Sequence, residues 1–211
     1  MPFDFLKRKK APDAAHSPAA VAKTQGVAFD GLTEDWRLIG RMMIVGRLSD
    51  ALNRREPIDI VEVQWGPVDG SEPLVAAPGL KTVDPYDLVI VLVGDDSLPE
   101  MTEDGKAAHR VHKVSYEVAV EVPPYRVIGT VYLHPGSEPD SLLSRSSEMF
   151  VPIVEATTTM GDQRVGPEAA SAVLVNRQYI RGVEQVDVRT GERHEKLPGA
   201  PLGGTNWTDR S

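Results

Sequence analysis

The pair His109 and His112 is the pattern in this chain that comes closest to a metal site. Two imidazoles three positions apart lie on the same side of a helix and could share one zinc ion. A stable zinc site needs three or four protein ligands, however, and the chain contains no cysteine. Because residues 104–110 have the composition of a solvated linker, we expect both histidines to be surface residues and predict no metal site.

Acidic side chains gather just after the longest apolar run, and carboxylate oxygens are ligands that Ca²⁺ and Mg²⁺ prefer. The cluster consists of Asp95, Asp96, Glu100, Glu103 and Asp104. It lacks the ligand spacing of a helix–loop–helix calcium site. The better interpretation is a charged loop that keeps a sheet edge soluble.

Catalytic patterns are equally weak. His134 precedes Pro135 and Gly136 in an expected turn, and no partner residue makes it a credible base. The glycines between residues 198 and 204 neither follow a strand nor open a helix, so they predict no phosphate or dinucleotide loop. The sequence therefore predicts no catalytic residue, no cofactor and no metal, and favours a protein that is not an enzyme.

Composition narrows the function classes further. The chain has 211 residues, with 31 acidic and 23 basic side chains and a net charge of −8. Nucleic-acid binders usually carry the opposite balance, because neutralised phosphates drive their affinity. The longest apolar run, residues 88–93, is far shorter than the roughly 20 residues of a membrane span. The N-terminal basic residues follow the apolar ones, which is the reverse of a secretory signal. We therefore expect a cytoplasmic protein that binds no nucleic acid.

Two segments at the ends, residues 1–26 and 189–211, lack hydrophobic periodicity and are expected to be disordered. Their large apolar and basic side chains are the candidates for interaction. These candidates are Phe3, Phe5, Lys7, Arg8, Lys9, Lys10 and Trp207. The N-terminal group could touch an anionic membrane weakly, at about 1 kcal/mol per basic residue. Trp207 could anchor an interface with a partner or with its own domain.

Between these segments, alternating or continuous runs of Val, Ile and aromatic residues predict strands. The predicted strands cover residues 36–45, 58–63, 88–93, 114–122, 125–133, 150–156, 172–175 and 179–186. Residues 88–93 are apolar throughout, which is typical of a strand buried on both faces. Two short helices are predicted at residues 49–55 and 137–145.

The two predicted helices occupy corresponding places in an internal repeat. Arg-x-Ile-Gly, Asp-x-Leu-x-x-Arg and Ile-Val-Glu recur in order at offsets of 89, 90 and 93 residues, and Val91 then corresponds to Val183. This order and near-constant spacing indicate a tandem duplication. The predicted fold is mainly β (α+β), with two small β-barrel-like or curled-sheet units that each read β-β-α-β-β-β. The first unit covers residues 27–97, the second covers 111–188, and residues 98–110 link them.

Four of the recurring residues have expected backbone roles. Gly40 and Gly129 lie inside strands, where glycine often marks a bulge or a tight bend. Asp50 and Asp140 lie at helix starts, where an aspartate can cap the free amides.

Four further residues recur on the strands. Arg37 and Arg126 carry the positive charges, and Glu62 and Glu155 carry the negative ones. We hypothesise that Arg37 pairs with Glu62 and Arg126 with Glu155, as one ion pair repeated in both units.

The chain resembles an uncharacterised family of small bacterial domains with three sequence elements. They are Tyr-Arg-Ile-x-Gly-Thr, Leu-Ser-Asp-x-Leu-Asn and Phe-Ile-Pro-Leu, which residues 125–130, 48–53 and 150–153 match. The resemblance covers most of residues 27–186, once per unit. The first unit departs from the third element at residues 58–60, and the second departs from the helical element at 139–143. The resemblance implies a bacterial cytosolic protein without assigned chemistry.

These observations lead to three expectations about function. The first is a non-enzymatic interaction or scaffold module that binds a protein partner or self-associates. The second is a sensor of a small ligand or nucleotide, with its site between the two units. The third is peripheral membrane association through residues 1–10.

Overall fold

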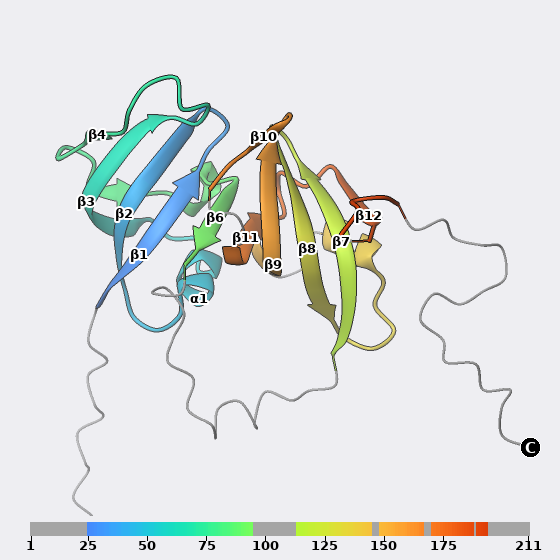
Figure 1. Cartoon of the computed structure of the whole chain (residues 1–211). Helices are drawn as coiled ribbons and strands as arrows, with labels where there is room; N and C mark the ends of the chain where they lie inside the picture. The colour runs from blue at the N-terminus through green and yellow to red at the C-terminus, as the bar shows by residue number, and fades with distance from the viewer. Residues whose placement is uncertain (1–24, 95–112, 145–147, 167–169, 188, 194–211) are drawn as a thin grey trace, which may run out of the picture.

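The computed structural model describes residues 25–94, 113–144, 148–166, 170–187 and 189–193 (Figure 1). These residues are mainly β-structure, as the sequence predicts, and form one open antiparallel sheet of 12 strands. The strands follow one another in two groups. We call β1 to β6 unit 1 and β7 to β12 unit 2.

Unit 1 begins with a hairpin whose second strand leads into the short helix. Its elements are β1 (Gln25–Leu32), β2 (Trp36–Ile44), α1 (Leu48–Asn53), β3 (Ile58–Pro67), β4 (Val75–Ala76), β5 (Thr82–Val83), the 3-10 turn η1 (Pro85–Asp87) and β6 (Ile90–Val93). The helix forms where it is predicted, because Leu48, Ala51 and Leu52 all bury one apolar face.

Unit 2 repeats this order, and its main difference is the seven-residue β11 in place of the two-residue β4 and β5. Its elements are β7 (Val114–Val122), β8 (Tyr125–Leu133), the 3-10 helix η3 (Pro139–Leu143), β9 (Phe150–Met160), β10 (Gln163–Arg164), β11 (Ala170–Asn176) and β12 (Gly182–Gln185). The predicted second helix is therefore a shorter 3-10 helix, which begins at Pro139 because proline suits a first helical turn.

The strand order in the sheet is β12-β7-β8-β9-β11-β6-β1-β2-β3-β4, with β5 on β3 and β10 on β9. The same pairing occurs in both units, since the last strand of each lies beside its first strand. The sheet is not closed on itself. Of the two predicted forms, barrel-like or curled sheet, the curled sheet is therefore the one that is confirmed.

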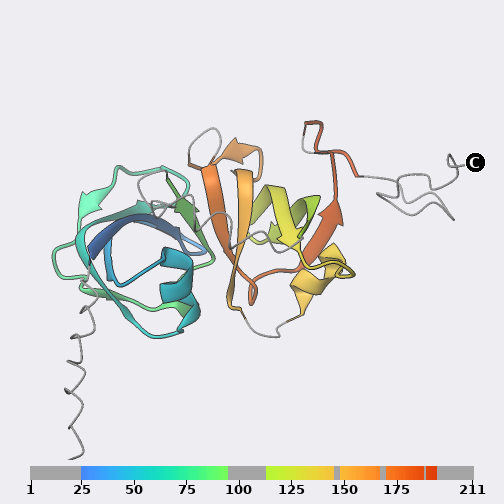
Figure 2. The same cartoon turned by 90° about the horizontal axis from the view of Figure 1, so that it is seen from below.

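Strand β11 joins the two units. It pairs with β9 of its own unit on one side and with β6 of unit 1 on the other (Figure 1). Strands β6 and β11 are buried on both faces. For β6, this confirms the prediction made from the continuous apolar run of residues 88–93. Seen from below, the strands of each unit curve around their own interior (Figure 2).

Two hydrophobic cores lie on opposite faces of this shared pair of strands. Core 1 lies inside unit 1 and takes Val91 from β6 and Leu174 from β11. Core 2 lies inside unit 2 and takes Ile90 and Val173 from the same two strands. Successive side chains of a strand point to opposite faces, so each strand supplies both cores.

Polar side chains complete the junction between the units. The side chain of Asn53, at the end of α1, donates to the Phe150 carbonyl and accepts from the Phe150 amide. Asn176 is fully buried, and its Nδ2 donates to the Leu88 carbonyl at 2.9 Å. The Tyr125 hydroxyl donates to the Thr33 carbonyl at the tip of the β1–β2 hairpin.

The ends of the predicted units need correction. Gln25 and Gly26 belong to β1, although residues 1–26 are predicted to be a disordered tail. At the other end, Val186 forms a β-bridge with Arg193, so residues 189–193 are an ordered turn and not part of a tail. The predicted linker, residues 98–110, lies outside the described residues, as do residues 1–24 and 194–211.

Candidate interaction surface

The glycines predicted to mark bulges lie where the strand register shifts. In unit 1 the register between β2 and β3 shifts at Gly40, and in unit 2 the register between β8 and β9 shifts at Gly129. A Cβ atom at Gly129 would lie 2.8 Å from the Val154 carbonyl oxygen, and one at Gly40 would lie 2.9 Å from that of Val61. Only glycine fits such close backbone approach, so both bulges depend on it.

The residues facing these glycines have an uncommon conformation. Glu62 has a φ of 55° and Glu155 a φ of 51°, which is the left-handed region that favours glycine. Each is the extra residue of its bulge and is exposed to solvent. The two glutamates therefore shape the strands at these bulges.

The predicted repeated ion pair is wrong in both units. Arg37 instead forms two hydrogen bonds with Asp30, at 2.9 and 2.6 Å, and this partner raises the pKa of the guanidinium. Arg126 lies 3.0 Å from Glu121. Arg37 is opposite Gly66 in the register, which places Glu62 four residues, or about 13 Å, farther along β3.

The predicted helix caps are wrong as well. Arg47 is the residue at the cap position of α1 and Glu138 that of η3, and neither makes a side-chain capping hydrogen bond. Asp50 and Asp140 both lie within the first turn. There their negative charges lie near the positive end of the helix dipole, which is favourable, but they do not occupy the cap position.

Two exposed tryptophans form the most distinctive surface of unit 1. The rings of Trp36 and Trp65 stack with centroids 4.6 Å apart and an angle of 22° between their planes. They are 41% and 39% exposed, which is high for side chains of this size. Val75 pairs with Trp65 across β3 and β4 and is also exposed. We call these three residues the tryptophan surface.

The register explains the stacking. Trp36 is opposite Pro67 and Trp65 is opposite Leu38, so the two rings are diagonal neighbours on one face. This is the face that carries Leu38 and Val63 into core 1. The tryptophan surface therefore lies on the same face of the sheet as core 1, next to the part of that face that is buried.

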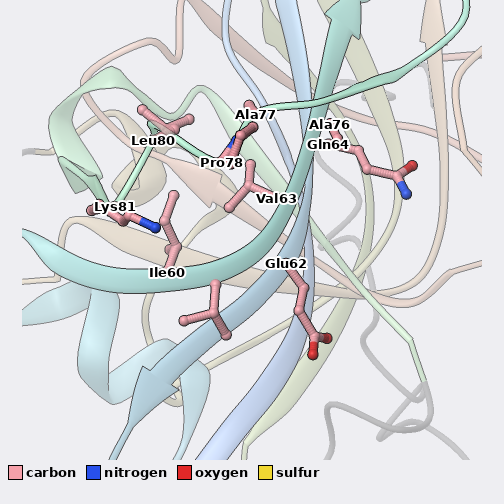
Figure 3. A pocket seen from close by; sticks show the side chains of 10 residues that line it. Ile60, Glu62, Val63, Gln64, Ala76, Ala77, Pro78, Leu80 and Lys81 are labelled. Atoms are coloured by element: carbon pink, nitrogen blue, oxygen red, sulfur yellow. The ribbon is translucent and has the colours of Figure 1, made fainter.

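A groove opens beside this surface. It has a volume of about 370 Å³ and lies between β3 and the segment that connects β4 to β5. Figure 3 shows Ile60 and Val63 pointing toward Leu80 and Lys81 of that segment, whereas Glu62 points away. Ile60 and Val63 are buried members of core 1, so the groove lies over the edge of that core without exposing it, and Val61 is its exposed apolar residue.

The connecting segment of the groove replaces a continuous strand. It touches β3 through the bonds from Ala77 N to the Val63 carbonyl and from Ile60 N to the Lys81 carbonyl, both 2.8 Å. In unit 2 the corresponding edge of β9 is paired along the seven residues of β11. The edge of unit 1 is therefore less completely covered than the edge of unit 2.

Other predicted site residues have little or no support. His134 is exposed in the turn after β8, as expected. Within the described ranges, no group of three or more His, Asp or Glu residues could hold a metal ion. No helix in the described part of the chain is long and apolar enough to cross a membrane. The remaining candidates lie outside the described residues. They are Phe3, Phe5, Lys7, Arg8, Lys9, Lys10, His109, His112, Trp207 and the acidic cluster.

The chain matches no family model, no curated protein and no solved structure. Sequence reasoning missed Trp36 and Trp65, which are 29 residues apart. Their proximity depends on the β2–β3 register, and that register follows from the bulge at Gly40.

Proposed function

We propose that this protein is a non-enzymatic interaction module that binds protein through the tryptophan surface of unit 1. The observation that carries the proposal is the stacked and exposed pair of Trp36 and Trp65 at one end of the open sheet. Tryptophan is among the residues that contribute most to binding energy at protein interfaces, because it buries a large area at a low entropic cost.

The edge of the sheet supports the same proposal. Beside the two rings, Val75 and the groove leave apolar atoms in contact with water. Edge strands commonly pair with a strand of a binding partner, and the side chains next to the edge then give specificity. The family resemblance supports a bacterial cytosolic location for such a module.

The test compares proteins captured by three versions of the full chain. We expect the wild type to retain one or more proteins, its own chain included, that a Trp36→Thr, Trp65→Thr double variant loses. Threonine preserves the strand propensity of both positions. The matched control is Tyr132→Thr, since Tyr132 is an exposed aromatic residue of unit 2 and is 52% exposed.

Quantitative mass spectrometry identifies the proteins, and each is then purified and its affinity measured by calorimetry. A tryptophan-dependent dissociation constant supports the proposal. If no captured protein distinguishes the double variant from the wild type, the tryptophan surface is not a binding site.

A further inference from the structure

The two open ends of the sheet correspond to the two strands that pair where the units meet. At the internal junction, β11 of unit 2 pairs with β6 of unit 1. One outer end of the sheet is β12. This strand is the last strand of unit 2 and therefore corresponds to β6, the last strand of unit 1. The other outer end is formed by β4 and β5, which follow β3 as β11 follows β9. The two ends therefore have the order needed to pair with each other in different molecules.

We propose that β12 of a second copy of this chain pairs with the β4–β5 edge and covers the tryptophan surface. The proposal rests on the proposed function, because it names a second copy of the chain as the protein that is bound. It describes a head-to-tail contact, in which two different surfaces meet. Such contacts continue into rings or filaments and do not stop at a symmetric dimer.

The internal junction predicts a register for the new contact. Val175 of β11 pairs with Val151 as Val83 of β5 pairs with Ile58, which makes Val83 the counterpart of Val175. Likewise Val183 of β12 faces Val120 as Val91 of β6 faces Gly31. Since Leu174 faces Val91 at the internal junction, Thr82 would face the second copy's Val183.

The same register brings opposite charges together. The internal pair Val173 and Leu92 corresponds to Lys81 of one copy and Glu184 of the next. Opposite charges directly across two strands stabilise their pairing. Lys81 is exposed, and Glu184 lies 3.7 Å from the highly exposed Arg193, which is a weak competing partner.

A second pair of residues that meets at the internal junction is replaced by different residue types at the two open ends. Asn53 bonds to both backbone groups of Phe150 at the internal junction. The corresponding residues at the open ends are Leu143 of η3 and Pro57 before β3. Proline has no amide hydrogen for an asparagine to accept, and the leucine, which is 44% exposed, offers an apolar contact instead.

Trp36 also has a counterpart at the internal junction. Trp36 occupies the place in unit 1 that Tyr125 has in unit 2. Tyr125 is buried, and burial raises its pKa, because it reaches the hairpin tip of unit 1 and bonds to the Thr33 carbonyl. In a second copy, the hairpin tip of unit 2 carries Pro123 and Pro124, both exposed. Trp36 would contact this tip, and aromatic side chains commonly bind proline in this way.

The open contact is more polar than the internal one. The apolar Val89 and Leu92 of unit 1 correspond to Arg181 and Glu184 of unit 2. Reversible interfaces are generally more polar than permanent ones, because each partner must also be stable in water on its own. We therefore expect association that depends on protein concentration and weakens as salt screens Lys81 and Glu184.

The experiment uses the full chain and measures mass by sedimentation and light scattering across a concentration series. The wild type is expected to grow beyond two chains as its concentration rises. One variant blocks the tryptophan surface with Trp36→Thr and Trp65→Thr, and another blocks the β12 end with Leu143→Asp and Glu184→Lys. Each variant alone is expected to remain a single chain, with an unchanged circular dichroism spectrum as the control for folding.

An equimolar mixture of the two variants provides the decisive result. One intact surface remains on each partner, so the mixture is expected to form complexes of two chains and no larger species. Separately, Lys81→Glu and Glu184→Lys should each weaken assembly severalfold, and the double charge swap should restore it. A two-chain species formed by either blocked variant alone would overturn the head-to-tail contact.

A wild type that stays a single chain at every concentration would also overturn this inference. It would leave the proposed function standing if the tryptophans still bind a different protein. If neither a second copy nor another protein binds through the tryptophans, both proposals fail.

Discussion

Asn53 and Phe150, 97 residues apart, form a pair of hydrogen bonds. The side chain of Asn53 bonds to the backbone amide and carbonyl of Phe150, as the backbone of a neighbouring strand would. The Phe150 amide donates to Asn53 Oδ1 at 2.8 Å, and Asn53 Nδ2 donates to the Phe150 carbonyl at 3.3 Å. The pair joins the end of α1 to the start of β9. It therefore holds the helix of one unit against a strand of the other.

Replacing Asn53 with alanine is expected to lower the free energy of unfolding by about 1–3 kcal/mol, because both backbone groups of Phe150 lose their partner. The measurement is urea denaturation followed by circular dichroism. Asp50→Ala is the matched control on the same helix, and a loss of about 0.5 kcal/mol is expected there because Asp50 makes no capping bond. Equal losses in the two variants would contradict a special role for Asn53.

Asn176 predicts a pH effect. Its buried Nδ2 faces the carbonyl oxygens of Leu88 and Pro85. An Asn176→Asp variant would place a carboxyl group there, and burial beside these oxygens raises its pKa above the ordinary value of about 4. The folded variant then binds more protons than the unfolded one, so its stability relative to wild type falls as the pH rises above about 4. Urea midpoints of both proteins between pH 4 and 8 measure this difference, and a constant difference would contradict it.

Gly129→Ala is expected to destabilise the protein by about 1–3 kcal/mol, because the new Cβ would press on the Val154 carbonyl oxygen 2.8 Å away. Thermal and urea unfolding measure the loss. Gly79→Ala provides the control, since a Cβ at Gly79 meets no atom within 4 Å. Similar stabilities for the two variants would show that the bulge can relax around a side chain.

Glu155→Gly is expected to raise the free energy of unfolding by about 0.5–1 kcal/mol, because glycine adopts a φ of 51° without strain. Glu155→Ala removes the carboxylate but keeps the strained φ, so it should leave stability nearly unchanged. The same comparison at Glu62 should give the same result. An equal effect of glycine and alanine would mean that the side chain, and not the backbone, determines the change.

The pairing of Arg37 can be measured with double-mutant cycles. We expect Arg37→Ala and Asp30→Ala to show a coupling energy of about 0.5–1 kcal/mol, because the pair is bidentate and partly buried. Arg37→Ala combined with Glu62→Ala should show additive effects. Coupling between Arg37 and Glu62 instead would restore the ion pair that the sequence suggested.

The sequence predicted local features well where one periodicity dominated. Strands β7 and β8 begin and end at the predicted residues, because Val114 to Val122 alternate and two prolines end the first strand. Strand β1 has no clear signal in the sequence, since glycine and aspartate interrupt its pattern. Pairing partners were harder to predict. Arg37 has two candidate carboxylates, and only the register of the hairpin selects Asp30.

The candidate surface could not be read from the sequence, because burial depends on distant segments. Trp36 and Tyr125 both begin a second strand, yet one is exposed and the other is covered by the opposite unit. That the two units arose from one ancestral domain stays a prediction. The recurrence of the bulges and of the pairing of last and first strands supports it.

The position of β11 has a consequence for synthesis of the chain. As residues 25–94 leave the ribosome, β6 has a bare edge and core 1 lacks Met149, Phe150 and Leu174, which are made later. Unit 1 therefore cannot complete its core until most of unit 2 has been translated. Long-range pairing of this kind slows folding and exposes apolar surface on the way. A nascent chain of this protein is thus a candidate substrate for chaperones, and a fragment that ends at residue 94 should aggregate instead of folding.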